Sequence, residues 1–575
     1  MNIGKITVLF LFPLCLPALL PGQWRPWRPA PAGVEFRMDD LAERPARYRL
    51  LTLAEDRWPA DTFELWLPRP DGTEVRFRVW PAPVLAPGLA ARYPDIRTYA
   101  GVGAGGARLR LVRTNRGLQA MVLDSRGDYF LDAQAGDPTA AVAYYRRDLP
   151  AAAFECKTRS AGLLRWREDT PPAFPGDSLR TYRLAVAATG EYTQYHGGTV
   201  EGALEAIATT VHRVNGIYER DLAVRFLIVE KNDRLVFSDP ATDPYTNNNE
   251  KQENQEVIDG LIGDRHYDIG HVFGVAEKGS VSSAEIESAC VEGSKAMGSS
   301  RLTTPVGDAF DVDRVAHEIG HQLGAHHTFN KCGAQQGPHP VEPGGGSTIM
   351  TWAGICGEDD LQANSDAYFH GISIEEMTRY VATGGGCATT TALSNAPPDV
   401  PLELPEYHLP VRTPFALPAV AIDADGDSLL YAWEQIDEGP STPVDQPAGT
   451  APLFRSQPPA PDTFRVFPRL EALLQNETPF GETLPFYTRP LTFRLTARDS
   501  RGGVAWADYR LQATEAAGPF VVLTQNEAGE AWLGGSAVEV AWAVANTDRP
   551  PVSAATVDIL LSADGGRTFP ILLAA

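Results

Sequence analysis

The sequence lacks the surplus of positive charge that nucleic-acid binding requires. Its 575 residues include 50 lysines and arginines, nearly all of them arginine, against 73 aspartates and glutamates, which gives a formal net charge of −23 at pH 7. Because a phosphate backbone is bound by a basic face, nucleic acid is excluded as an expected partner. The hydrophobic fraction of 43% and the charged fraction of 21% are those of a globular protein rather than a disordered chain.

Long apolar runs are also missing. The apolar stretch at residues 6–20 is interrupted by Pro13 and Pro17 and is too short for a stable membrane span. Lys5 before it supplies the positive charge of a secretory signal, so residues 1–22 are predicted to be a cleaved signal peptide. No later segment is long and apolar enough to cross a bilayer. We therefore predict a secreted, extracellular protein with no membrane span.

Cysteine is scarce, with only six in the sequence, and Cys15 lies inside the predicted signal. Removal of the signal leaves an odd number, so at least one thiol has no partner within the chain. Disulfides form in exported proteins, and the four cysteines around a histidine cluster permit two disulfides in any of three pairings. Those four are Cys290, Cys332, Cys356 and Cys387, while Cys156 stands alone upstream.

The chain is too long for a single core, and its pattern of apolar, polar and turn residues changes along its length. Residues 23–176 alternate short apolar and polar segments between turns, the pattern of a β-rich domain, and end in a linker with Pro171, Pro172 and Pro175. Residues 177–394 alternate strand and helix patterns, which favours a sheet with helices packed on it. We expect strands there at 181–188, 223–229 and 267–273, and helices at 199–220, 250–263 and 311–323.

Proline-rich strands and turns return after this region, without helical periodicity. We interpret residues 395–515 as a β-sandwich of the immunoglobulin or cadherin kind. Residues 516–575 are predicted to be a partial second β-sandwich module. The sequence stops at Ala575 in an apolar run where a further strand is expected, which indicates a truncated module.

An acidic run marks the first of these modules. Asp423, Asp425 and Asp427 alternate before an expected strand, and Asp499 could join them. Carboxylates at such spacing suit Ca²⁺, although the flanking sequence is not that of an EF-hand. An acidic β-turn explains the pattern equally well, because Asp and Gly are ordinary turn residues. The modules could bind a matrix or cell-surface ligand, and nothing in the sequence identifies it.

The stretch that begins at His317 reads His-Glu-Ile-Gly-His-Gln-Leu-Gly-Ala-His-His and fits H-E-x-x-H-x-x-G-x-x-H. On a helix, His317 and His321 lie one turn apart, so both imidazoles can reach one ion. Gly324 suits a left-handed turn that ends the helix and returns His327 to that ion. Three nitrogen ligands with one open position are typical of catalytic Zn²⁺. Glu318 is then the general base toward a metal-activated water that attacks a peptide carbonyl.

A helix with solvated histidines is the alternative interpretation. The added glycine and third histidine make a chance match much rarer than a bare H-E-x-x-H. His326 competes with His327 as the third ligand, but its spacing does not fit the glycine turn, so we expect His327.

The extended motif resembles that of the metzincins, whose clan also carries a methionine-containing turn below the metal. Residues 347–356 supply such a turn, with Met350 as its expected methionine, although a core methionine is the simpler explanation when seen alone. With residues 311–330 and 365–370, these segments resemble bacterial secreted reprolysin-like (adamalysin-type) metalloproteases, over roughly residues 179–390. The resemblance implies a zinc-dependent endopeptidase that acts on proteins or peptides.

The implied architecture is multidomain. Its centre is an α/β metzincin catalytic domain, with a twisted mixed sheet and helices above an irregular lower subdomain, preceded by a β-rich propeptide and followed by β-sandwich modules. Two positions depart from the family pattern. Trp352 stands where some metzincins place a metal-binding tyrosine, so no fifth protein ligand is expected. Thr328 stands where adamalysins typically have aspartate, which leaves a pappalysin-like relative as an alternative.

In many metzincin zymogens a propeptide thiolate occupies the open zinc position. Cys156 is chemically suited to this role, because a metal lowers the pKa of a thiol. We therefore predict that residues 23–176 are a propeptide with Cys156 as its cysteine switch. A free or mispaired thiol is the alternative, since no recognised switch motif surrounds Cys156.

Two other functions compete with the protease. One is an adhesin or inactive binding protein that retains a structural zinc site. The presence of Glu318 argues against it, because a purely structural site does not need that residue. The other is a zinc hydrolase of non-peptide substrates, which the methionine turn disfavours because that context belongs to proteases.

Overall fold

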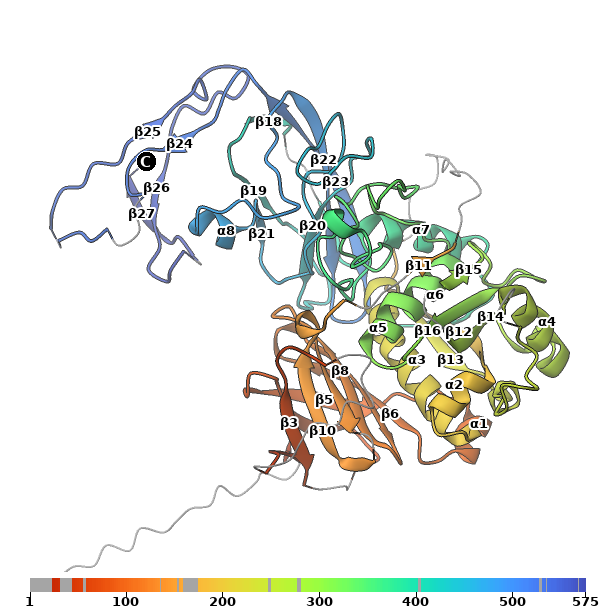
Figure 1. The fold of residues 1–575 in the computed structure, drawn as a ribbon. Helices are drawn as coiled ribbons and strands as arrows, with labels where there is room; N and C mark the ends of the chain where they lie inside the picture. Colours follow the sequence, from red (N-terminus) through yellow and green to blue (C-terminus); the bar gives the residue numbers. More distant parts are fainter. Residues whose placement is uncertain are drawn as a thin grey trace, which may run out of the picture.

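The protein is described by a computed structural model with three regions in chain order: an N-terminal region up to residue 158, whose last strand joins the central sheet, a central region at 174–394, and a C-terminal region from 395 onward (Figure 1). The predicted signal peptide and two of the linker prolines, Pro171 and Pro172, lie outside the described residues. Among the residues described, no helix combines the length and the apolar character that a bilayer crossing requires. The described residues are 23–31, 44–54, 58–134, 136–151, 155–158, 174–246, 250–276, 281–401, 405–526, 530–533, 535–566 and 568–574.

The N-terminal region forms a ten-stranded, largely antiparallel sheet in the order β1-β4-β5-β6-β7-β8-β9-β10-β3-β2. Strand β5 shows why: its valines and phenylalanine are buried and alternate with exposed charged residues, so one face packs on a core. The bounds are β1 Gln23–Trp24, β2 Trp27–Pro29, β3 Arg49–Leu53, β4 Phe63–Pro68, β5 Glu74–Pro81, α1 Pro87–Arg92, β6 Arg97–Gly103, β7 Arg108–Thr114, β8 Gly117–Leu123, β9 Tyr129–Gln134 and β10 Asp137–Tyr145.

The central region is a mixed sheet with helices, as the sequence predicted. Its strand order is β11-β15-β16-β14-β12-β13, with β17 also paired to β12. Strands β13, β12, β14 and β16 are parallel, whereas β15 and β17 run antiparallel to their neighbours β16 and β12. The strand bounds are β11 Glu155–Cys156, β12 Ser178–Ala188, β13 Val224–Ile228, β14 Ile269–Val275, β15 Val281–Ala284, β16 Gly298–Leu302 and β17 Thr389–Ala392.

Helix α3 lies between this sheet and the N-terminal region. Thr199 caps its start by accepting a hydrogen bond from the Gly202 backbone, and Ala223 ends it in the left-handed conformation. Most of the helix is buried, because β7 and β8 cover the face that the central sheet leaves open. The helices of the region are α2 Gly190–Tyr195, α3 Val200–Leu222, α4 Glu250–Ile262, α5 Asp308–Phe310, the π-helical η6 Asp311–Ala316, α6 His317–Gln322 and α7 Gly371–Ala382.

The N-terminal region pairs with both edges of the central sheet. At one edge, the Ile228 backbone of β13 bonds to Val84 and Ala86 at 2.8 and 2.9 Å. At the other edge, β11 lies parallel to β15, with Cys156 opposite Ser282. Sheet edges offer unpaired backbone groups, and here segments of the N-terminal region satisfy them.

The C-terminal region contains two sheets that share a core. A four-stranded sheet, β18-β23-β22-β20, packs with the ribbon β19–β21 around Trp433, Phe467 and Phe493. Beyond residue 518, the described residues form two short ribbons, β24–β25 and β26–β27. The bounds are β18 Tyr407–Pro410, β19 Phe415–Pro418, β20 Leu430–Gln435, β21 Phe464–Phe467, α8 Leu470–Leu474, β22 Arg489–Arg498, β23 Val504–Thr514, β24 Val521–Val522, β25 Trp542–Ala543, β26 Ile559–Leu561 and β27 Ile571–Ala574.

Candidate metal centre

The histidine helix owes its shape to two glycines. Gly320 faces the methionine turn, and a Cβ there would lie 2.7 Å from Met350 Sδ, so a larger residue would force the Met350 side chain to move. Gly324 has φ +98°, a conformation that favours glycine, and it follows directly on the end of α6. The chain can therefore reverse after the helix and bring the following loop back toward it.

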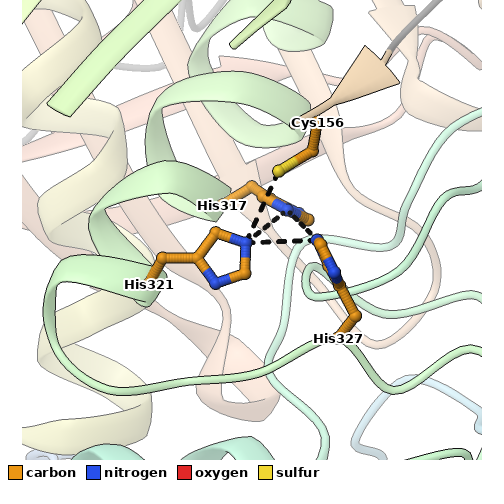
Figure 2. A group of neighbouring side chains, drawn as sticks. All are labelled: Cys156, His317, His321 and His327. Carbon is orange, nitrogen blue, oxygen red and sulfur yellow. Dashed lines mark hydrogen bonds between the residues drawn. The ribbon is translucent and has the colours of Figure 1, made fainter. Parts of the chain in front are cut away.

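Three imidazoles converge as a result (Figure 2). The Nε2 atoms of His317, His321 and His327 lie 3.1 Å from one another in all three pairs. In a tetrahedral zinc site with Zn–N distances of about 2.0–2.1 Å, two nitrogens are about 3.3 Å apart. The spacing of these three nitrogens therefore fits one shared zinc ion.

Backbone carbonyls fix the orientation of two of the rings. The Nδ1 atom of His317 lies 2.7 Å from the Ile349 oxygen, and that of His321 lies 2.7 Å from the Ala325 oxygen. When Nδ1–H donates, the Nε2 lone pair faces the shared point, which is the tautomer that a metal needs. Burial lowers the pKa of His317 to about 3, and burial with the neighbouring imidazoles lowers those of His321 and His327 well below 6.5. Neutral rings are good metal ligands.

Cys156 completes a group of four potential ligands. Its Sγ lies 3.6 Å from His321 Nε2, and in Figure 2 it points from β11 toward the three imidazoles. The four ligand atoms lie within 4.8 Å of one another, and all four residues are buried. Burial, followed by the Glu318 charge, raises the pKa of the Cys156 thiol well above its usual value. A cation at the centre would reverse that preference.

Glu318 lies beside this group and is fully buried. Its Oε2 accepts a hydrogen bond from the Thr158 hydroxyl at 3.2 Å. Burial raises the pKa of Glu318 to about 8, although Cys156, Thr158 and Arg314 act in the opposite direction. A carboxylate with a pKa near neutrality is suited to accept and return a proton.

The predicted methionine turn packs against the histidine helix at Gly320. Met350 is completely buried, and its carbonyl accepts a hydrogen bond from the Thr328 backbone at 3.1 Å. Trp352 stacks on Phe329 with ring centroids 4.6 Å apart, and its indole nitrogen lies 3.3 Å from His327 Nε2. An indole N–H is a donor only, so Trp352 supplies no metal ligand.

The structure separates His326 from the three converging histidines. Its Nδ1 lies 2.8 Å from Glu376 Oε1, and the same oxygen lies 3.1 Å from His339 Nε2. Burial alone would lower the pKa of His339, but hydrogen bonds to Glu376 and Glu438 raise it to about 10. Sequence reasoning missed this cluster, because its members come from separate segments with no shared spacing.

The cysteine pairing that the sequence left open is resolved. Cys290 pairs with Cys387, and Cys332 pairs with Cys356. Cys156 is the free cysteine among the described residues. The pairs join the loop after β15 to the end of α7, and the third-ligand loop to the methionine turn.

The acidic residues of the C-terminal region divide into two sets. The carboxylates of Asp423, Asp427 and Asp499 lie within 4.8 Å of one another. Asp425 is exposed instead, and its carboxylate accepts a hydrogen bond from the Ala396 backbone at 2.7 Å. Asn395, which the sequence did not single out, donates to Asp499 at 2.8 Å.

Residues 178–380 match the model of the metallo-peptidase family M12B, reprolysin-like. No curated protein matches the chain. Among solved structures, metalloproteinase-II from Bacteroides fragilis is similar at 11% sequence identity and a TM-score of 0.32, over 56% of this chain and 91% of that chain. The family match includes all three converging histidines, Glu318 and the methionine turn.

Proposed function

We propose, from the premise that residues 178–380 form a reprolysin-like metallopeptidase domain, that this protein is a zinc-dependent endopeptidase of proteins or peptides. The observation that carries the proposal is the convergence of three Nε2 atoms at 3.1 Å from one another, with Glu318 buried beside them. Three neutral imidazoles and an adjacent carboxylate are the donor set of a hydrolytic zinc site.

In this mechanism His317, His321 and His327 would hold the zinc. Bound zinc supplies a Lewis acid for the peptide carbonyl and lowers the pKa of a water toward neutrality. Glu318 would accept a proton from the attacking water while the water oxygen adds to the carbonyl carbon. Glu318 would then return the proton to the amide nitrogen as the carbon–nitrogen bond breaks, which releases a free amine and a carboxylic acid that ionises in water.

The N-terminal region is proposed to keep the enzyme latent. Residues 23–176 are the propeptide in this account, and Cys156 is the switch that takes the fourth zinc position. Support comes from the Cys156 sulfur, which faces the imidazoles, and from Thr158, which bonds Glu318. The pairing of β11 with β15 also covers the sheet edge beside the histidines.

Secretion and the domain division are part of the same proposal. Residues 1–22 would direct export, and the two disulfides are consistent with an oxidising compartment. Residues 177–394 would be the protease domain, with Met350 as the structural methionine below the metal. An immunoglobulin- or cadherin-like sandwich at 395–515 and a second β-type module at 516–575 would follow.

Calcium is proposed for the C-terminal acidic cluster, now with Asp499 and Asn395 in place of the exposed Asp425. Buried oxygens of Asn395 and Asp423 have no hydrogen-bond partner, and hard oxygen donors of this kind suit Ca²⁺. Arg501 lies 3.2 Å from Asp427 Oδ2 and compensates part of the negative charge. Calorimetric titration with CaCl₂ should give saturable binding that Asp499→Asn abolishes; no heat with the native chain would remove calcium from the account.

The catalytic role of Glu318 is tested by separating metal binding from turnover. In the processed enzyme, Glu318→Ala should retain zinc but lose roughly 10²–10⁴-fold of its casein-cleaving rate, the usual contribution of a general base. Glu292→Ala, an exposed glutamate of the same domain, should cleave normally, and a chelator should abolish cleavage by the native enzyme.

Two results would decide against this function. Undiminished cleavage by Glu318→Ala would exclude the proposed base. A zinc-containing native protein that never cleaves protein after processing would favour the adhesin alternative, in which the metal is structural.

A further inference from the structure

The third histidine lies on a loop rather than on the helix, so something outside the helix must fix it. Two buried glutamates hold the residues on either side of His327. Glu376 accepts the His326 backbone N–H at 3.0 Å, besides the ring contact already described. Glu342 accepts the Thr328 hydroxyl at 2.7 Å and donates its own backbone N–H to the Thr328 carbonyl at 3.0 Å.

Glu342 also bonds to the methionine turn. Its carboxylate accepts the backbone N–H groups of Ser347 and Thr348 at 2.9 and 3.2 Å, and the Thr348 hydroxyl at 2.5 Å. The loop of the third ligand and the turn below the metal are therefore joined through one buried carboxylate. This side of the support lies wholly within the central region.

The Glu376 side continues into the C-terminal region. His339 bonds to Glu376 through Nε2 at 3.1 Å and to Glu438 through Nδ1 at 2.7 Å. Its backbone N–H donates to the His327 carbonyl at 3.2 Å. His339 therefore links a residue of the C-terminal region to the backbone of the third ligand itself.

Further hydrogen bonds join the loop that follows His327 to the C-terminal region. The Gln336 side chain donates to the Gly439 carbonyl at 2.8 Å, and the Asn330 amide donates to the Pro440 carbonyl at 3.1 Å. Asn330 also accepts the Thr442 backbone N–H at 3.1 Å. Residues 438–442 thus lie against the loop that follows His327, through contacts to both side chain and backbone.

The cluster of His326, His339 and Glu376 could instead be viewed as a second metal site. His326 Nδ1 and His339 Nε2 each lie within hydrogen-bond distance of the Glu376 carboxylate. The other ring nitrogen of His339, Nδ1, lies within hydrogen-bond distance of Glu438. Charge-assisted hydrogen bonds of this kind satisfy the donors without an ion. The arrangement favours a positioning network over a metal site.

We propose that Glu376, His339 and Glu438 position His327, so that the C-terminal region contributes to the zinc affinity of the catalytic centre. The inference rests on the proposed function, in that it takes His327 as a zinc ligand. Groups outside the ligand set that orient a ligand typically change metal affinity by about 10–100-fold when mutated. Glu376 bonds directly to the residue beside His327, whereas Glu438 acts through His339.

The test measures zinc affinity in the full chain by competition with a chromophoric chelator. Glu376→Gln should weaken zinc binding about tenfold and Glu438→Gln a few-fold. Glu477→Gln, an exposed glutamate of the same region, is the matched control and should bind as the native chain does. In the Co²⁺-substituted protein, the absorption bands of the metal should shift in Glu376→Gln and not in the control.

Unchanged zinc affinity and unchanged cobalt bands in both variants would overturn the inference. Reduced thermal stability with native zinc affinity would also overturn it, since that is the signature of a merely structural role. If Glu376→Gln fails to fold, Glu438→Gln decides, because the Glu438 side chain is 49% exposed and its loss is better tolerated. A native chain without tight zinc would instead refute the proposed function itself.

Discussion

The N-terminal and C-terminal regions both pack on the central domain, but they reach the histidine centre from different sides. The N-terminal region brings Cys156 and Thr158 to face the imidazoles and Glu318 directly. The C-terminal region reaches the loop behind His327, through Glu438 and residues 439–442, and the methionine turn, where the Ser347 hydroxyl donates to the Ser456 carbonyl at 3.4 Å. A group in front of the ligands competes with substrate, whereas a group behind them supports the metal. Loss of the two regions should therefore have opposite effects on activity.

Both interfaces contain buried ion pairs. On the N-terminal side, Arg146 pairs with Asp308 and Asp313, and all three side chains are buried. On the C-terminal side, Arg498 pairs with Asp221 at 3.0 Å, and both side chains are fully buried. Buried ion pairs are costly to break because an unpaired charge remains behind. The difference between the regions lies in where they touch the centre.

Cys156→Ala should give the largest effect. If the thiol keeps the fraction of open sites at about 1%, its loss raises the proteolytic rate of the unprocessed chain roughly 100-fold. Cys156→Ser is a matched control for shape and should activate similarly, because a hydroxyl is a poor zinc ligand. The rate of casein cleavage by unprocessed protein measures this. Unchanged latency in both variants would show that the thiol does not block the site.

Substitution of the two buried arginines tests whether weakening the two interfaces changes the activity in opposite directions. Arg146→Met and Arg498→Met should each destabilise the chain by about 3 kcal/mol, measured by urea denaturation. Arg146→Met should raise the activity of the unprocessed chain, because the N-terminal region is held less firmly. Arg498→Met should lower zinc affinity without activating. Changes of the same sign in both variants would contradict the comparison.

Thr158→Val should produce a smaller change and only in an open site. Removal of one hydrogen bond to Glu318 is worth about 1 kcal/mol, or a few-fold in rate. In the Cys156→Ala background, the unprocessed chain should therefore become a few-fold more active. In the native background the thiol still blocks the zinc, so the rate should stay unchanged. If Thr158→Val alone activates the otherwise native chain, Thr158 contributes more than Cys156 to the latency of the unprocessed protein.

The acid dependence of the N-terminal interface should give the smallest change. Burial alone would raise the pKa of Glu219, but Arg110 and Arg225 lower it to about 2, below its usual 4.5. A depressed folded-state pKa stabilises the fold above about pH 4.5, and that stability is lost as the pH falls toward 2. Arg110→Gln should reduce this loss of stability by about 1 kcal/mol, measured as the free energy of unfolding in urea at pH 7, 4.5 and 3. If the native and variant free energies of unfolding fall in parallel with pH, the Glu219–Arg110 pair is excluded as the origin of the loss.

The sequence predicted the local features of the centre well. Helical spacing and a glycine turn suffice to bring His317, His321 and His327 together, because all three belong to one short segment. Strong periodicity likewise predicted β12, α3 and α4 to within a few residues of their observed bounds. The Cys156 hypothesis needed only the odd cysteine count and the family resemblance.

Long-range pairings were beyond the sequence. The two disulfides had three equally allowed pairings, and only the fold selects among them. Glu376, His339 and Glu438 come from a helix, a loop and another region, so no spacing signals their contact. Asp425 shows the converse: regular alternation suggested a shared site, yet its side chain turns to the Ala396 backbone.

X-ray absorption at the zinc edge of the unprocessed chain would show directly whether three imidazoles and the Cys156 thiolate share one ion. We expect three nitrogen scatterers at about 2.0–2.1 Å and one sulfur at about 2.3 Å, with the sulfur absent in Cys156→Ala. Fewer than three imidazoles in the zinc shell, or a sulfur signal that persists after Cys156 is removed, would contradict this expectation.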